Sequence, residues 1–286
     1  MKYDEPMSRY TSWRVGGPAD HLYIPADVDD LCHFLARLPA VEPLTWIGLG
    51  SNILVRDGGI RGTVVTVKNV LNELVVTGSG KLRVGAGLAC AKVARFAGKS
   101  GFTGADFLVG IPGTMGGALA MNAGAFGGET WDIVGSVETV NRRGERFHRE
   151  KSHYQIGYRS VRPLSDEWFL SADLILQTHR DDAGEDRIRE LLAKRSETQP
   201  MGEASCGSVF RNPEGDHAAR LIEASDLKGK RIGNAHVSEK HANFIINSGG
   251  ATAADIEELI QLIKETVKEK QNVLLQEEVL IIGDKA

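Results

Sequence analysis

Glycine is concentrated in one part of this 286-residue chain. Of its 33 glycines, nineteen lie within residues 48–128. Glycine adopts positive φ without steric cost and lets the backbone approach another group closely. We therefore expect this part of the chain to form repeated tight turns and close backbone contacts.

The composition narrows the class of protein. Hydrophobic residues make up 42% and charged residues 25%, as in soluble globular chains, and the length allows two or three domains. The net charge of −4 argues against binding to nucleic acid through bulk charge. Cys32, Cys90 and Cys206 form no C-x-x-C pair, so we expect neither a disulfide framework nor a metal site. We expect a cytoplasmic protein, because the first residues contain no apolar secretion signal.

Residues 107–128 contain no charged side chain, which raises the question of a membrane span. Seven of these residues are glycine and one is Pro112, and both types disfavour a continuous helix. We therefore expect no membrane insertion.

Short apolar runs alternate with helical patterns along the chain. The runs predict strands at 44–47, 63–67, 82–84, 136–140, 169–176 and 278–282. Apolar residues at helical spacing predict helices over 27–38, 89–98 and 252–272. The polar, turn-rich stretch 194–207 separates a glycine-rich part from a smaller part with both helix and strand. These patterns predict an α+β protein.

Two glycine-rich loops are candidates for binding an anionic ligand. Residues 48–52 follow a predicted strand, and residues 110–124 combine five glycines with Pro112 and no charge. Backbone N–H groups in such loops stabilise anions without a basic side chain. The alternatives are a hairpin or bulge turn for the first loop and a tightly packed core turn for the second.

Neither loop carries a known dinucleotide or nucleotide fingerprint. A G-x-G-x-x-G motif is missing because Ile53 and Cys90 stand where the third glycine is required. No G-x-x-x-x-G-K-[ST] sequence occurs either, which argues against a P-loop.

A series of motifs along nearly the whole chain points to one family. They read WRVGGPAD at 13–20, GLGSNILVRD at 48–57, GIPGTMGG at 110–117, YQIGYR at 154–159, GSVFRNP at 207–213 and EVLIIG at 278–283. The glycine loops alone would indicate only the flavin-binding superfamily related to vanillyl-alcohol oxidase. The last two motifs narrow the resemblance to the UDP-N-acetylenolpyruvoylglucosamine reductases, flavoenzymes of bacterial peptidoglycan synthesis.

The resemblance implies a two-part FAD-binding region of the vanillyl-alcohol oxidase type and a smaller α+β substrate-binding domain. On this basis residues 1–67 with 276–286 form the first FAD-binding part, 68–198 the second, and 199–275 the substrate domain. No long insertion separates Tyr154 from Ser208, so the chain resembles the shorter class that lacks an extra tyrosine-bearing loop. We expect a monomer.

The resemblance also implies non-covalent FAD, NADPH as the hydride source and a UDP-sugar substrate. The FAD contacts carried over are Gly48, Leu49, Gly50, Ser51, Asn52, Gly110, Ile111, Pro112, Gly113, Thr114, Gly116, Gly117, Asn122, Ala123 and Gly124. The substrate contacts carried over are Tyr158, Asn212, Lys228, His241 and Asn243. Without the resemblance, the basic run at 228–243 would be read as a solvated face.

Three residues match the catalytic positions of the family. Arg159 would stabilise the substrate carboxylate while flavin N5 supplies hydride, Ser208 would donate the proton, and Glu278 would assist beside them. Taken alone, an arginine after tyrosine is more often a surface or packing residue, the serine a capping or turn residue, and the glutamate a solvated acid. Cys206 flanks the serine, but this chemistry needs no covalent intermediate, so we read Cys206 as a packed residue.

Two other functions stay open from the sequence. One is a flavin oxidase of the same superfamily, which would turn over an alcohol with oxygen and need no NADPH. The other is a non-catalytic UDP-sugar binding protein, which would carry no flavin.

Overall fold

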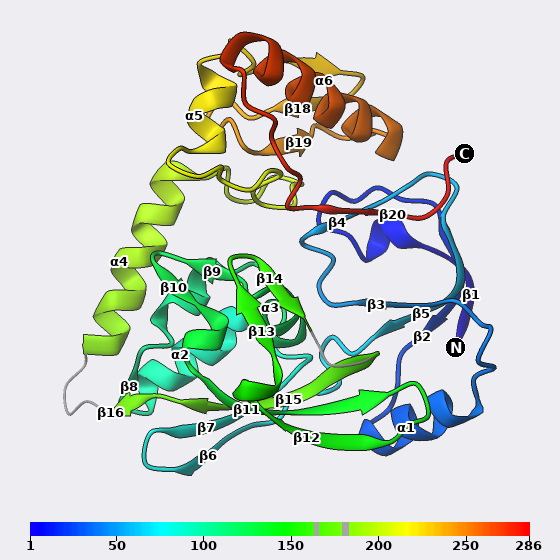
Figure 1. Ribbon diagram of the computed structural model, residues 1–286, viewed down its shortest axis with the longest axis vertical. Coiled ribbons are helices and arrows are strands. Elements are labelled where there is room, and N and C mark those ends of the chain that lie inside the picture. The colour runs from blue at the N-terminus through cyan, green and yellow to red at the C-terminus, as the bar shows by residue number, and fades with distance from the viewer. Residues whose placement is uncertain (163–165, 179–182) are drawn as a thin grey trace. The chain divides into compact units, whose positions relative to one another are not determined.

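The computed structural model of the chain describes residues 1–162, 166–178 and 183–286. The chain divides into two compact units (Figure 1). The first unit contains Met1–Leu22, Gly50–Val64 and Ser196–Ala286, and the second contains Tyr23–Leu49 and Val65–Arg195. Both units mix helices and strands, so the predicted α+β class is confirmed.

The first unit is assembled from stretches far apart in the sequence. Strand β1 pairs antiparallel with β2, and β20 pairs in parallel with β4. Strands β17, β18 and β19 form an antiparallel sheet in that order. The elements are β1 (Lys2–Pro6), the 3-10 turn η1 (Met7–Arg9), β2 (Pro18–Tyr23), β4 (Ile53–Val55), β5 (Ile60–Thr66), α5 (Ala218–Glu223), β17 (Arg231–Ile232), β18 (Ala235–Val237), β19 (Ile245–Asn247), α6 (Ala253–Gln271) and β20 (Leu280–Ile282).

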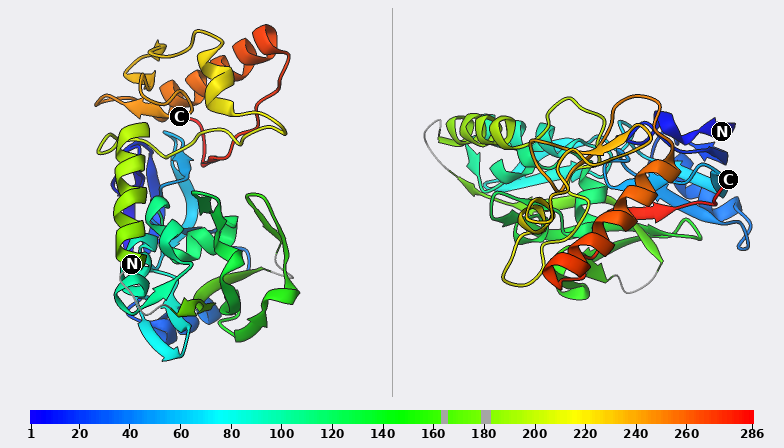
Figure 2. Two further views of the ribbon diagram at one scale, coloured as in Figure 1. Left: turned by 90° about the vertical axis from the view of Figure 1, so that its left-hand side faces the viewer. Right: turned by 90° about the horizontal axis from the view of Figure 1, so that it is seen from above.

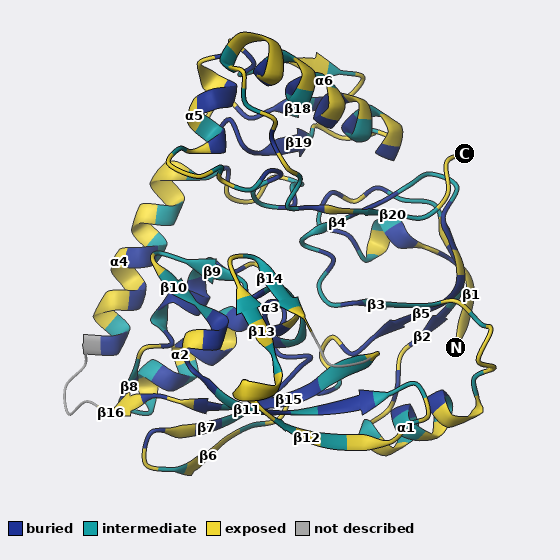
Figure 3. Cartoon of the chain, viewed as in Figure 1, coloured by how far each residue is buried: buried dark blue, intermediate teal, exposed yellow. Residues whose placement is uncertain are grey.

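Helix α6 organises the core of this unit. A capping box joins Thr252 and Asp255, which satisfies backbone N–H groups at the start of the helix. One side of α6 is buried and the other exposed (Figure 3), and α5 lies beside it (Figure 2). The buried side consists of Ala253, Ile256, Leu259, Ile260, Ile263 and Val267.

The second unit is built on an antiparallel sheet of five strands in the order β12-β11-β15-β7-β6. Its strands are β3 (Leu44–Ile47), β6 (Leu74–Gly78), β7 (Lys81–Gly85), β8 (Phe102–Thr103), β9 (Gly124–Ala125), β10 (Gly128–Glu129), β11 (Val134–Asn141), β12 (Arg146–Glu150), β13 (Gln155–Gly157), β14 (Ser160–Arg162), β15 (Glu167–Ile175) and β16 (Gln177–Thr178). Its helices are α1 (Val28–Arg37), α2 (Cys90–Lys99), α3 (Met115–Met121) and α4 (Ala183–Thr198), which continues past the boundary of the unit, with 3-10 turns η2 (Asp106–Gly110), η3 (Thr130–Asp132) and η4 (Lys151–His153).

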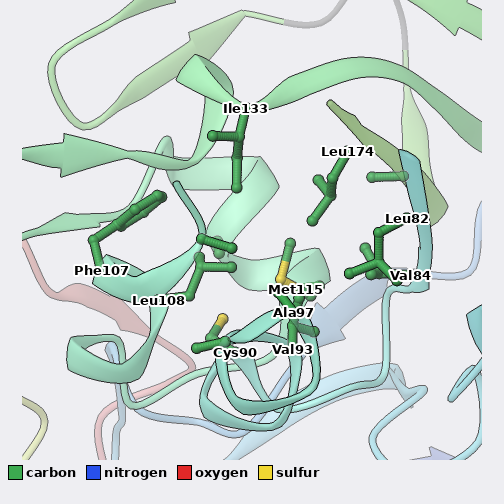
Figure 4. Close-up of a cluster of buried hydrophobic side chains, with 14 of the residues drawn as sticks. Leu82, Val84, Cys90, Val93, Ala97, Phe107, Leu108, Met115, Ile133 and Leu174 are labelled. Atoms are coloured by element: carbon green, nitrogen blue, oxygen red, sulfur yellow. The ribbon is translucent and has the colours of Figure 1, made fainter. Parts of the chain in front are cut away.

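The main core of this unit lies between the sheet and helices α2 and α3 (Figure 4). Leu82 and Val84 of β7 and Leu174 of β15 are buried on the sheet side. Val93 of α2 and Met115 of α3 are buried on the helix side. This packing holds α3, and with it the second glycine-rich loop, against the sheet.

The six predicted strands and three predicted helices are all present, with ends shifted by a few residues. Three helices were not predicted: α3 inside the second glycine loop, α4 and α5. The division between the two units, after Arg195, falls within the expected boundary at 194–207, but the first residues of that stretch are helical because α4 runs on to Thr198. No helix within the described residues is long and apolar enough to cross a membrane.

Candidate active site

The two glycine-rich loops meet in the second unit. A Cβ on Gly48, just after β3, would lie only 2.5 Å from Oγ1 of Thr114. Thr114 begins α3, and its hydroxyl accepts a hydrogen bond from the N–H of Gly117 at 3.5 Å. Gly116 is similarly restricted, because its Cβ would lie 3.1 Å from Cβ of Ala86. Glycine is therefore needed where the end of β3 and the start of α3 approach each other.

A cavity of about 190 Å³ opens beside this contact. Its lining includes the small or polar residues Gly48, Thr114, Gly116 and Gly117 and the acidic Glu167. Its aromatic lining is Trp46, Trp168 and Phe169. The rings of Trp46 and Trp168 are stacked, with centroids 4.9 Å apart. Nε1 of Trp46 is buried and has no hydrogen-bond partner within the described residues. The aromatic lining was not predicted, since nothing in the sequence except their type distinguishes these tryptophans.

In the rest of the first loop, the hydrogen bonding of residues 49–51 differs from that of Asn52. The backbone N–H groups of residues 49–51 donate to no acceptor in the part of the chain that the structure describes. Gly50 has φ +68°, and a Cβ there would overlap the carbonyl oxygen of Tyr10. The side-chain amide of Asn52, in contrast, donates to the carbonyl of Glu278 at 2.9 Å. Residues 49–51 thus present donors, while Asn52 ties the loop to the last strand.

The second loop serves partly as a core turn. Ile111 is buried in the main core, and the carbonyl of Gly113 accepts a hydrogen bond from Cys90 N. A Cβ on Gly110 would lie 2.5 Å from the ring of Phe126. Pro112 is exposed. Close packing within the protein therefore accounts for Gly110 and Gly116, while Gly117 lines the cavity.

Asn122 is buried and its side chain is occupied within the protein. Its amide nitrogen donates to Glu129 at 2.7 Å and to the carbonyl of Gly157 at 3.1 Å, and its amide oxygen accepts from Trp131 N at 3.0 Å. These bonds orient the loop that carries Ala123 and Gly124. The Asn122 side chain is thus fully engaged within the protein, and its contact with FAD stays a prediction.

Arg159 lies next to this same loop. Its Nη2 donates to the carbonyl of Gly124 at 2.9 Å and its Nη1 to that of Asn122 at 3.4 Å, and Glu129 is 4.0 Å away. The arginine occupies the turn between β13 and β14 and has φ +50°, a left-handed conformation that is unfavourable for a residue with a Cβ. Tyr158, in the same turn, is 49% exposed, and the guanidinium lies over its ring. The structure thus brings a predicted catalytic residue to two predicted FAD-loop residues.

In the first unit, the backbone of Glu278 is paired with that of Val209, the residue after Ser208. Glu278 N donates to the carbonyl of Val209 at 2.8 Å, so the serine precedes the residue that is paired with the glutamate. The Ser208 hydroxyl is half-buried and makes no hydrogen bond within residues 1–162, 166–178 and 183–286. Glu277 is instead paired with Lys264 at 2.6 Å. The two predicted catalytic side chains of this unit therefore share one stretch of paired backbone.

Asn243, expected to contact substrate, is buried and bonded to the backbone of Phe210 through both polar atoms of its side chain. Asn212 accepts a hydrogen bond from Ala218 N at the start of α5. Lys228 is paired with Glu223 at 2.7 Å. Burial lowers the pKa of His241, and its Nδ1 accepts from Asn243 N. Each of these residues has a partner within the protein.

Cys206 is confirmed as a packed residue. It is 2% exposed, and burial raises the pKa of its thiol to about 12. A thiol with this pKa does not act as a nucleophile at neutral pH.

Two family models match the chain. Residues 19–149 match the FAD binding domain, and residues 199–282 match the C-terminal domain of UDP-N-acetylenolpyruvoylglucosamine reductase. The reductase of this name from Alkalilimnicola ehrlichii is 55% identical over 99% of this chain and 95% of its own length. That from Methylococcus capsulatus is 56% identical over 98% of this chain and 92% of its own length. The chain belongs to the UDP-N-acetylenolpyruvoylglucosamine reductase family.

Solved structures agree with this family membership. The reductase of the family from Thermus caldophilus is 31% identical, with a TM-score of 0.85 over 97% of both chains. A 6-hydroxy-D-nicotine oxidase from Arthrobacter nicotinovorans, at 12% identity, has a TM-score of 0.53 over 90% of this chain and 81% of its own, which shows a shared fold. The predicted FAD-binding region and the smaller C-terminal domain of this family are therefore confirmed.

Proposed function

We propose that this protein reduces the enolpyruvyl group of UDP-N-acetylglucosamine enolpyruvate to UDP-N-acetylmuramate, with NADPH as electron donor and FAD as cofactor. The observation that supports the proposal is the hydrogen bond from Glu278 N to the carbonyl of Val209, the residue after Ser208, in a chain of this family. The hydroxyl of Ser208 can donate the proton that such a reduction needs, and in this proposal the carboxyl of Glu278 assists it.

The residues around the first glycine loop fit part of an FAD molecule. The cavity beside Gly48, Gly116 and Gly117 has flat aromatic and small polar walls, and the N–H groups of residues 49–51 offer donors to a diphosphate. A volume of about 190 Å³ is smaller than usual for a whole drug-sized ligand, so the cavity would take one part of the cofactor. When bound, FAD would supply hydride transfer from NADPH to the methylene carbon of the substrate.

The chain's own residues stabilise the negative charge that develops on the substrate and supply the proton that completes the reduction. Negative charge develops on the carbon next to that methylene and spreads into the attached carboxylate. We assign Arg159 to this carboxylate, since a guanidinium binds a carboxylate through two parallel hydrogen bonds. The Ser208 hydroxyl delivers the proton to the carbon, and Glu278 assists that transfer.

Four finer points belong to the same proposal. Residues 1–67 with 276–286 and residues 68–198 would hold FAD, and 199–275 would bind the UDP-sugar. We propose a monomer of the shorter class, acting in the cytoplasm. Size-exclusion chromatography with light scattering tests the oligomeric state, and a mass of about 31 kDa is expected for the monomer.

An absorption spectrum taken without oxygen tests the function. We expect flavin bands that bleach with NADPH and return on addition of UDP-N-acetylglucosamine enolpyruvate. Return of the bands only with oxygen and an alcohol substrate would support a flavin oxidase instead. A colourless protein that cannot be reconstituted with FAD would leave only the UDP-sugar binding protein.

A further inference from the structure

Asn243 fixes the backbone on the side of the Ser208 segment that faces away from Glu278. Its amide oxygen accepts from Phe210 N at 2.9 Å, and its amide nitrogen donates to Phe210 O at 2.8 Å. Its own carbonyl accepts from Val209 N at 2.9 Å. Asn243 thus supplies three of the hydrogen bonds that hold residues 209 and 210.

The opposite edge of this segment is held by the last strand region. The carbonyl of Val209 accepts from Glu278 N at 2.8 Å and from Val279 N at 3.3 Å, and Phe210 pairs with Glu277. Residues 209 and 210 therefore lie between Asn243 and Glu278 as the middle of three paired segments. Any shift of Phe210 moves Ser208, two residues earlier, relative to Glu278.

The site of these bonds is closed to water. Asn243 is 3% exposed and Phe210 is 1% exposed. Removing the amide would leave a buried N–H and a buried carbonyl of Phe210 without partners, and a buried unpaired group is costly. The backbone would be expected to move toward other partners. Both polar atoms of the Asn243 side chain are engaged with Phe210.

We propose that Asn243 is a positioning residue that sets the place of the Ser208 hydroxyl relative to Glu278 for proton transfer. This inference rests on the proposed function, because it requires Ser208 to be the proton donor. It assigns to Asn243 no contact with the UDP-sugar.

Half-reactions of the FAD-loaded enzyme, followed by flavin absorbance in stopped flow without oxygen, test the assignment. We expect Asn243→Ala to slow reoxidation by saturating UDP-N-acetylglucosamine enolpyruvate roughly 10- to 100-fold, the size of effect known for small misplacement of a reacting group. Reduction by NADPH should stay within about twofold of the wild-type rate, because Ser208 takes no part in it. Adding Asn243→Ala to Ser208→Ala should cost little beyond Ser208→Ala alone, since both changes act through one hydroxyl.

Two further variants keep the result interpretable. Thr252→Ala removes the N-cap of α6 and lowers stability without touching the Ser208 segment, so its reoxidation rate should equal that of the wild type. Asn243→Asp keeps the acceptor for Phe210 N but loses the donor to Phe210 O; we expect a slower reoxidation even if Asn243→Ala does not fold.

The outcomes separate this inference from the proposed function. Normal reoxidation in Ser208→Ala would remove the serine from the mechanism, and the proposed function would fail in that part. Slow reoxidation in Ser208→Ala with wild-type rates in both Asn243 variants would overturn the positioning role alone. A change in the substrate concentration needed for half-saturation, with an unchanged limiting rate, would also overturn it and indicate direct substrate contact.

Discussion

Arg159 is held in a backbone conformation that arginine seldom adopts. A left-handed φ on a residue with a Cβ costs roughly 1 kcal/mol or more, and such residues cluster at functional sites. The hydrogen bonds from its guanidinium to the carbonyls of Gly124 and Asn122 help to hold it there. The sequence motif predicted Arg159 as a site residue. The sequence could not predict its partners, because they come from a loop 35 to 37 residues away.

We expect Arg159→Lys to slow reoxidation by the enolpyruvyl substrate by about 100-fold or more, since a single ammonium cannot replace the planar fork of a guanidinium. FAD affinity should change only a few-fold. Stopped-flow absorbance and FAD titration of the apoprotein measure the two quantities.

Arg162→Lys is the matched control for this prediction. Arg162 is exposed on β14 of the same hairpin, and its replacement should leave both half-reactions unchanged. A near wild-type reoxidation rate in Arg159→Lys would refute the role given to the guanidinium.

Helix α3 could not be predicted from the sequence. Its Gly116 and Gly117 are poor helix formers, so the pattern indicated an open loop. The helix forms because its buried residues, Met115, Ala118 and Leu119, pack in the main core. The capped, one-sided pattern of α6 could be read directly from the sequence. The short α5 and the highly charged α4 offered no such pattern.

The close approach of β3 and α3 predicts that one added methyl group at Gly48 weakens FAD binding. Gly48→Ala should weaken FAD binding by about tenfold or more, because the new Cβ would lie 2.5 Å from Thr114 Oγ1. Thr114→Ala removes that oxygen. The double variant should therefore bind FAD better than Gly48→Ala alone, as measured by fluorescence titration. Equal affinity of the double variant and Gly48→Ala would show that the clash with Thr114 is not the cause.

Asp57, at the end of the GLGSNILVRD motif, caps the first turn of helix α6 although it lies far from that helix in the sequence. Its carboxylate oxygens accept from Ala253 N at 3.0 Å and Ala254 N at 2.9 Å. We expect Asp57→Ala to lower the free energy of unfolding by about 1–2 kcal/mol, the usual range for loss of a helix cap. Urea denaturation measures the loss. Glu214→Ala, which removes an exposed carboxylate of the same unit, should cost less than about 0.5 kcal/mol, and an equal loss would contradict the capping role.

The first unit combines parts of the chain that the motif resemblance predicted to lie in separate domains. Trp13 Nε1 donates to the carbonyl of Ile245 at 2.7 Å, and Asn247 donates back to Trp13 O at 2.8 Å. Arg56 donates through two nitrogens to Glu257 of α6 at 2.8 and 2.9 Å. The motifs contain Trp13 and Arg56 but could not show which residues these contact. Each contact joins residues about 200 or more positions apart.

The pair of Arg56 and Glu257 predicts a pH dependence of stability. Hydrogen bonds from Arg56 lower the pKa of Glu257 from its ordinary value of 4.5. A carboxyl with a lower pKa in the folded state stabilises the fold above its unfolded pKa, and this contribution is lost as pH falls through the folded value. The wild type should therefore exceed Glu257→Gln in unfolding free energy at pH 7, by about 1 kcal/mol or less, with the difference shrinking as pH falls below the ordinary pKa of 4.5. Urea denaturation from pH 3 to 7 checks it, and a constant difference would contradict the assignment.

The parallel pairing of β4 with β20 sets an order of events during synthesis on the ribosome. Arg56, which follows β4, bonds to the carbonyl of Gly283, 227 residues later. At translation rates of roughly 5–20 residues per second, β4 waits on the order of 10 to 50 seconds for its partner to be made. The apolar edge formed by Ile53, Leu54 and Val55 is unpaired by β20 throughout that interval. Until residues 280–282 have been made, this strand edge of the nascent chain is thus open to pairing with other chains.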